Sequence, residues 1–113
     1  MIIDNDKLDK ASQGLRGIAH PTRLAILCHL ASGPMNVGEL MLATDVSQAS
    51  LSQHLAKLRL LNILKCERQG QQMFYQHTNP AFLAVINAIK DVYCPDNTDK
   101  PQANITIRKE DKL

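Results

Sequence analysis

The chain has 113 residues, which is the length of a single domain. Hydrophobic residues make up 44% of it, but Trp is absent and there are only two Phe and two Tyr, so aliphatic side chains must fill the core. A net charge of +2 excludes a strongly basic or acidic chain, and the three cysteines, an odd number at wide spacing, argue against a disulfide framework. No signal peptide and no apolar run of about 20 residues is visible, so we expect a cytoplasmic protein without a membrane segment.

The first part of the chain predicts two helices. Apolar residues at helical spacing favour a helix over 4–17. A second helix is expected to begin at Pro21, because proline lacks the amide hydrogen that would be unpaired at the first helical position. The Ser-Gly-Pro sequence at 32–34 then ends it.

A helix-turn-helix is predicted next. Asn36 and Glu39 have the spacing of a capping box, which predicts a third helix running through Ala43. A short turn follows, and Ser47 is placed to cap a longer helix that reaches Leu61. Two helices separated by about four residues are typical of the helix-turn-helix motif.

The longer helix has two unlike faces. Leu51, Leu55 and Leu58 form an apolar stripe, whereas the other face carries amides, hydroxyls and a cation that suit the edges of bases in a DNA major groove. Between residues 47 and 72, four cations stand against one acid, as phosphate neutralisation requires. Any solvated helix can show a polar face, so the helix alone does not decide the function. The residues expected in the groove are Gln48, Ser50, Ser52, Gln53, His54 and Lys57.

A β-hairpin is expected directly after this helix. Two strand-like runs, 63–68 and 72–77, are joined by a short link that contains Gly70, and glycine at a tight link is a hairpin signal. A recognition helix followed by such a wing is the core of a winged helix-turn-helix. Arg68 and Gln71 on the wing are expected to reach the adjacent DNA backbone or minor groove.

The last predicted helix covers 81–94 and is unusually apolar. Phe82, Ile86, Ile89 and Tyr93 share one face. Because one small domain cannot easily cover so much apolar surface, we expect a dimer interface rather than simple core packing. Two-fold dimers that read palindromic operators give this interface a use.

The predicted fold class is therefore mainly α with a β-hairpin wing, in the order of four helices, two strands and a final helix. The protein is expected to be a homodimer through its first and last helices. Residues 1–95 would form the DNA-binding and dimerisation domain, and the polar residues 96–113 a loose tail.

Several segments resemble one family. Residues 20–27, HPTRLAIL, resemble the second-helix signature of the ArsR/SmtB family of bacterial repressors. Residues 46–58 resemble that family's recognition helix, and residues 68–71 with Phe74 and Tyr75 resemble its wing. The resemblance implies a homodimeric winged-helix repressor that leaves its operator when a metal or another inducer binds.

The metal-sensing patterns of that family are missing. No cysteine lies in 37–41, where thiophilic-metal sensors carry a Cys-x-Cys pair, and the last helix has Asp91 but no histidine. The four histidines show no ligand spacing, and His29 is expected to be a surface or partly buried residue. We therefore expect no metal site and no cofactor.

Two cysteines instead resemble the sulfide-responsive branch of the family, the SqrR, BigR and HlyU types. Cys28 lies on the second helix and Cys94 at the end of the last one. In that branch the pair forms a polysulfide bridge with persulfides, or oxidises, and operator binding weakens. A cysteine on an apolar helix stripe is otherwise a small buried hydrophobe. Cys66, in the first wing strand, is expected to be structural filler, with an off-pathway disulfide as the alternative.

We therefore expect a repressor whose operator affinity is switched by Cys28 and Cys94. Its partners would be double-stranded operator DNA, a second copy of itself and a reactive sulfur species or peroxide. The alternatives are a redox-insensitive operator binder, an antirepressor that competes with a nucleoid protein, a metal-responsive repressor, and a protein–protein module that has lost DNA binding. The sequence contains no nucleophile–base pair and no phosphate loop, so we do not expect an enzyme.

Overall fold

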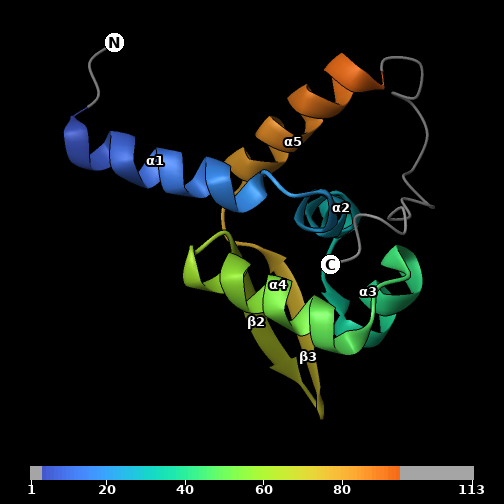
Figure 1. Cartoon of the computed structure of the whole chain (residues 1–113). Helices are drawn as coiled ribbons and strands as arrows, with labels where there is room; N and C mark the ends of the chain where they lie inside the picture. The colour runs from blue at the N-terminus through green and yellow to red at the C-terminus, as the bar shows by residue number, and fades with distance from the viewer. Residues whose placement is uncertain (1–3, 95–113) are drawn as a thin grey trace.

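The computed structural model describes residues 4–94 (Figure 1). The elements are α1 (Asn5–Ile18), α2 (Pro21–His29), the 3-10 turn η1 (Leu30–Ser32), β1 (Met35–Asn36), α3 (Val37–Thr44), α4 (Gln48–Leu60), β2 (Leu64–Gln69), β3 (Gln72–His77) and α5 (Pro80–Tyr93). The predicted winged helix-turn-helix is confirmed. The expected tail, 96–113, lies outside the described residues.

The sheet has one strand that the sequence did not predict. β1 pairs with β3, and Met35 lies opposite Tyr75, so the three strands have the antiparallel order β1-β3-β2. Two residues are too short to show the alternation that identifies a strand, and β1 exists because its backbone pairs with a strand far along the chain. The hairpin turns at Gly70, whose φ of 66° is easily adopted by glycine.

Local capping agrees with the sequence. Asn36 Oδ1 accepts from the Glu39 amide at 2.8 Å, and Glu39 Oε1 accepts from the Asn36 amide at 3.0 Å, so the capping box at the start of α3 is formed. Ser47 caps α4, and Pro21 opens α2. A cap that the sequence did not predict is His20, whose Nδ1 accepts from the Thr22 amide at 3.1 Å.

The core lies between the helix-turn-helix, α2 and the sheet. Leu51, Leu55 and Leu58 of α4 are buried against Ile26 and Leu27 of α2. Helix α2 contacts α1, α3, α4 and α5, and therefore connects the DNA-reading helix with the terminal helices. A displacement of α5 relative to α2 can therefore be passed on to α4.

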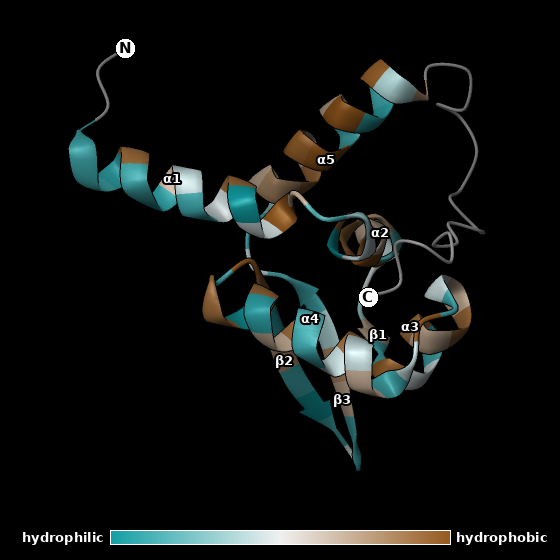
Figure 2. Ribbon diagram, in the orientation of Figure 1, coloured by the Kyte–Doolittle hydropathy of each residue, from teal (hydrophilic) through white to brown (hydrophobic). Residues whose placement is uncertain are grey.

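Helices α1 and α5 leave apolar surface uncovered. They lie on the side away from the hairpin, and α5 carries a run of hydrophobic residues (Figure 2). Of its apolar face only Ile86 is buried, whereas Val92 is 68% and Tyr93 78% exposed. Helix α5 ends at Tyr93, so Cys94 caps the helix and is not part of it. Within the described residues, no helix has both the length and the apolar content to cross a bilayer.

Candidate DNA-binding surface and cysteine pair

Helix α4 presents the polar face that the sequence predicted. Because its leucine stripe is buried, Gln48, Ser52, Gln53 and Lys57 are left exposed to solvent. The Ser47 hydroxyl accepts from the Ser50 amide at 3.2 Å and fixes the start of the helix. These exposed amides, hydroxyl and ammonium can donate to and accept from base edges and phosphates.

Two of the residues predicted to enter the groove are less exposed than the others. Ser50 and His54 are half-buried. The His54 ring faces α2, with its centroid 4.6 Å from that of His20. Burial lowers the pKa of His54, and the neighbouring His20 and Arg23 lower it further. Neutral His54 is thus favoured, and it lies at the edge of the α4 face, beside α2.

The wing carries its predicted residues at the tip. Arg68 and Gln71 are exposed, and Arg68 Nε donates to the Gly70 carbonyl at 3.0 Å, which holds the guanidinium near the turn. The wing is also joined to the helix-turn-helix, because Asn36 Nδ2 donates to Gln72 Oε1 at 2.9 Å. The wing and α3 are therefore held in a defined relative position.

Cys28 lies on α2, and Cys94 directly follows α5, which contacts α2. Both are free thiols; Cys28 is half-buried and Cys94 is exposed. Burial raises the pKa of the Cys28 thiol above its ordinary value, Lys90 of α5 lowers it in part, and Cys94 raises it. Lys90 and Cys94 therefore lie within electrostatic reach of Cys28, which sequence spacing alone cannot predict.

The remaining cysteine and two further histidines are packed or hydrogen-bonded within the fold. Cys66 lies opposite Tyr75 in the hairpin, where burial and then Cys66 raise the pKa of the Tyr75 hydroxyl. His77 Nε2 donates to the Leu27 carbonyl at 3.0 Å. His29, expected at the surface or partly buried, is buried with 7% exposure. Among residues 4–94, no group of three or more His, Cys, Asp and Glu side chains is arranged to hold a metal ion.

Comparison with known proteins identifies the family. Residues 20–65 match the model of the "Bacterial regulatory protein, arsR family". The regulator YgaV from Escherichia coli K12, an HTH-type transcriptional regulator, is 39% identical over 77% of this chain and 89% of its own length. The chain belongs to the ArsR family. The predicted resemblance is confirmed.

Solved structures of ArsR-family proteins agree with this assignment. Reduced HlyU from Vibrio cholerae matches with a TM-score of 0.73 and 35% identity, over 79% of this chain and 94% of that one. The repressor BigR from Xylella fastidiosa matches with a TM-score of 0.73 and 31% identity, over 79% and 91%. This ArsR-family chain is therefore a DNA-binding transcriptional regulator and not an enzyme. Members of the family bind operator DNA and are typically dimers.

Proposed function

We propose that this regulator is a homodimeric repressor whose operator affinity is switched by Cys28 and Cys94. The observation that supports the proposal is the contact of α2 with α5, which brings Cys94 and Lys90 within electrostatic reach of Cys28. Two thiols that neighbour each other can exchange a bond after one of them has reacted. DNA would be bound by the exposed residues of α4 and by Arg68 and Gln71 at the wing.

The two cysteines have different roles in this proposal. Cys94 is exposed and meets the inducer first. Cys28 is protonated at neutral pH because burial raises its pKa, so it is a slow nucleophile until it has a sulfur electrophile next to it. Lys90 opposes this shift and supports the Cys28 thiolate during the second step.

The sulfur chemistry balances with a persulfide as the oxidant. The Cys94 thiolate attacks the terminal sulfur of a persulfide, RSSH. That sulfur is transferred to Cys94, which becomes a persulfide, and the remainder leaves as the thiol RSH. The Cys28 thiolate then attacks the Cys94 Sγ, hydrogen sulfide leaves, and a disulfide forms. If a second persulfide first extends Cys94 by one more sulfur, the Cys28 thiolate attacks the sulfur bonded to Cys94 Sγ, hydrogen sulfide leaves, and a trisulfide forms. A peroxide would instead give a sulfenic acid on Cys94, and Cys28 would displace water.

A bridge between these cysteines would tie the end of α5 to α2. Helix α2 contacts α3 and α4 of the helix-turn-helix, and α5 presents the apolar surface expected to meet a second copy. Bridging would therefore change the separation of the two recognition helices. Half-sites on DNA lie one helical turn apart, so a changed separation lowers the affinity.

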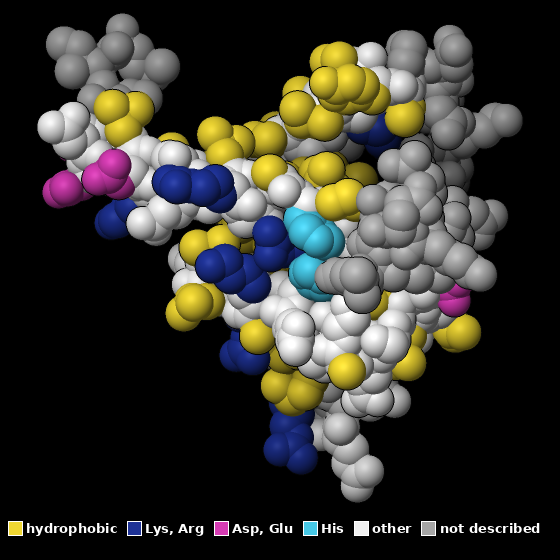
Figure 3. Space-filling model, viewed as in Figure 1, with side chains coloured by type: hydrophobic (Ala, Val, Ile, Leu, Met, Phe, Trp, Pro, Cys, Tyr) yellow, Lys and Arg dark blue, Asp and Glu magenta, His cyan; other side chains and the backbone are white. Residues whose placement is uncertain are grey.

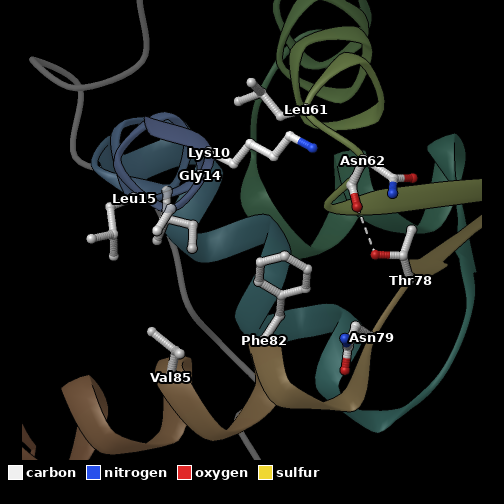
Figure 4. Close-up of a pocket in the computed structure, with 11 residues that line it drawn as sticks. Lys10, Gly14, Leu15, Leu61, Asn62, Thr78, Asn79, Phe82 and Val85 are labelled. Atoms are coloured by element: carbon white, nitrogen blue, oxygen red, sulfur yellow. Dashed lines mark hydrogen bonds between the residues drawn. The ribbon is translucent and has the colours of Figure 1, made fainter. Parts of the chain in front are cut away.

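The surface that a second copy would cover is a groove between α1 and α5, of about 640 Å³. Leu15 of α1 and Phe82 and Val85 of α5 lie around it (Figure 4). Its polar end is tied by Thr78, whose hydroxyl donates to the Asn62 carbonyl at 2.7 Å. Beyond the groove, Leu8, Ile89 and Val92 extend the exposed apolar surface.

Sedimentation equilibrium tests this interface. Ile89 is 44% exposed on α5, and Ile89→Glu should convert the dimer to monomer because it would bury an unpaired carboxylate. Leu42→Glu is the matched control, since Leu42 is 89% exposed on α3, away from both terminal helices. Equal dimerisation of the two variants would refute the interface.

Single-cysteine variants test the switch. After treatment with a persulfide donor, Cys28→Ser should accumulate a persulfide on Cys94 and keep its DNA affinity, because no bridge can form. Cys94→Ser should react slowly at the half-buried Cys28. Release of Cys28→Ser from DNA by the persulfide would contradict the proposal.

A second candidate is a redox-insensitive operator binder. The half-burial of Cys28 and its raised pKa favour this candidate, since they are also the properties of a packing cysteine. It predicts that wild-type DNA affinity stays constant even when mass analysis finds both cysteines modified.

A further inference from the structure

A basic hollow lies where α1, α2 and α4 meet. It measures about 470 Å³, and Gln13 and three cations line it together with Gly17 and Leu61. The cations come from three helices: Arg16 from α1, Arg23 from α2 and Lys57 from α4. No acidic side chain of residues 4–94 lines it. Figure 3 shows Lys and Arg side chains gathered beside two histidines in the middle of this face, whereas the acidic side chains in view lie towards its margins.

Arg23 is the residue that ordinary helix chemistry does not explain. Arg16 and Lys57 lie in the last turns of their helices, where a cation is favoured by the helix dipole. Arg23 lies in the first turn of α2, where the dipole disfavours a cation and no acid is present. Its Nε is buried and has no hydrogen-bond partner among the described residues. Such an unpaired donor is costly unless water or a ligand accepts from it.

The shape and charge of the hollow favour one class of ligand. Guanidinium and ammonium groups converging from three sides match the tetrahedral oxygens of a phosphate, and Arg is the residue best suited to contact them. The hollow is also continuous with the recognition surface, because Lys57 belongs to both. A DNA strand that passes over the exposed face of α4 would therefore bring its backbone to Arg16 and Arg23.

We propose that the basic hollow binds a phosphate group, and that operator DNA supplies it from the backbone beside the recognition helix. Arg16 and Arg23 would then position the duplex without reading its sequence. This inference rests on DNA binding and is independent of the cysteine switch. His54, whose pKa is lowered in part by Arg23 of the hollow, would report the bound anion.

The salt dependence of duplex binding tests the proposal. Fully reduced protein is titrated by fluorescence anisotropy against a mixed-sequence duplex of about 25 base pairs over a salt series. Each lost phosphate contact should reduce the slope of log K against log salt by about 0.9. Arg16→Gln and Arg23→Gln should each show this loss, and Arg23→Lys should recover most of it. Lys7→Gln is the control, since it removes one cation from the opposite end of α1.

A second measurement distinguishes the phosphates of the operator backbone from a free phosphate compound as the ligand. Inorganic pyrophosphate is titrated into the protein while the His54 ring protons are followed by NMR over a pH series. A bound anion should raise the pKa of His54, in wild type but not in Arg23→Gln. Urea unfolding of each variant confirms that it is folded, and Arg16→Gln, at an exposed position, tests the site if Arg23→Gln is unstable.

The outcomes are distinct. Reduced salt slopes for both Arg variants, with Lys7→Gln unchanged, support the proposal. A pyrophosphate response with unchanged slopes would overturn the operator backbone as the source and leave a free phosphate compound as the ligand. If the salt slopes are unchanged and pyrophosphate gives no response, the phosphate site is refuted altogether. Salt-independent binding of the wild type would refute DNA binding itself.

Discussion

Asn36 joins α3 to the wing through three hydrogen bonds, and its replacement has a calculable cost. Its side-chain oxygen accepts from the Glu39 amide and caps α3, its backbone amide donates to the Glu39 carboxylate, and its side-chain amide donates to Gln72 on the wing. Losing an N-cap costs about 1 kcal/mol. An exposed hydrogen bond between side chains contributes about 0.5 kcal/mol. Asn36→Ala should therefore lower the free energy of unfolding by about 1.5 kcal/mol.

Asn36→Ser separates the two contributions. Serine caps a helix about as well as asparagine but cannot reach Gln72, so its cost should be only about 0.5 kcal/mol. The assay is urea unfolding followed by far-UV circular dichroism, with all variants at one protein concentration because dimerisation adds to stability. If Asn36→Ala and Asn36→Ser were equally destabilised, capping would not be what orders α3. Gln72→Ala should cost as little as Asn36→Ser.

Two further predictions concern packing and protonation. Gly17→Ala should be less stable than Gly14→Ala by about 1 kcal/mol, because the methyl at position 17 would overlap the Leu61 side chain and lie 3.3 Å from Ile63 Cδ1, whereas a methyl at position 14 meets nothing within 4 Å. Equal thermal stability of the two variants would contradict this packing. The unfolding free energy should fall as the pH is lowered below about 6.5, because burial lowers the folded-state pKa of both His77 and His54, so the unfolded chain binds protons first. His77→Asn should flatten this dependence between about pH 7.5 and 5.5, and an unchanged slope would show that His77 is not its source.

Local sequence signals predicted most of the fold. Pro21, the Asn36–Glu39 pair and Ser47 act within one helical turn, so their spacing is sufficient to place the helix starts. The leucine stripe of α4 likewise determines which face is buried. The strand β1 was missed because it depends on pairing with β3, which lies about forty residues further along the chain.

The candidate sites depend more heavily on distant contacts. Composition indicated that the α4 face is polar, but only the packing of α2 turns His54 towards His20 and places Arg23 beside Lys57. The nearness of Cys28 and Cys94 depends on how α5 crosses α2. Helical periodicity gives the face of each helix, but not the neighbour that meets it.

Operator binding before and after treatment with a persulfide donor tests the central claim most directly. Wild-type protein is measured by fluorescence anisotropy, and the same samples are analysed by intact mass and peptide mapping. We predict a loss of affinity together with a Cys28–Cys94 link, with or without additional sulfur, and recovery of both on reduction. Unchanged affinity in samples that carry this link would contradict the account.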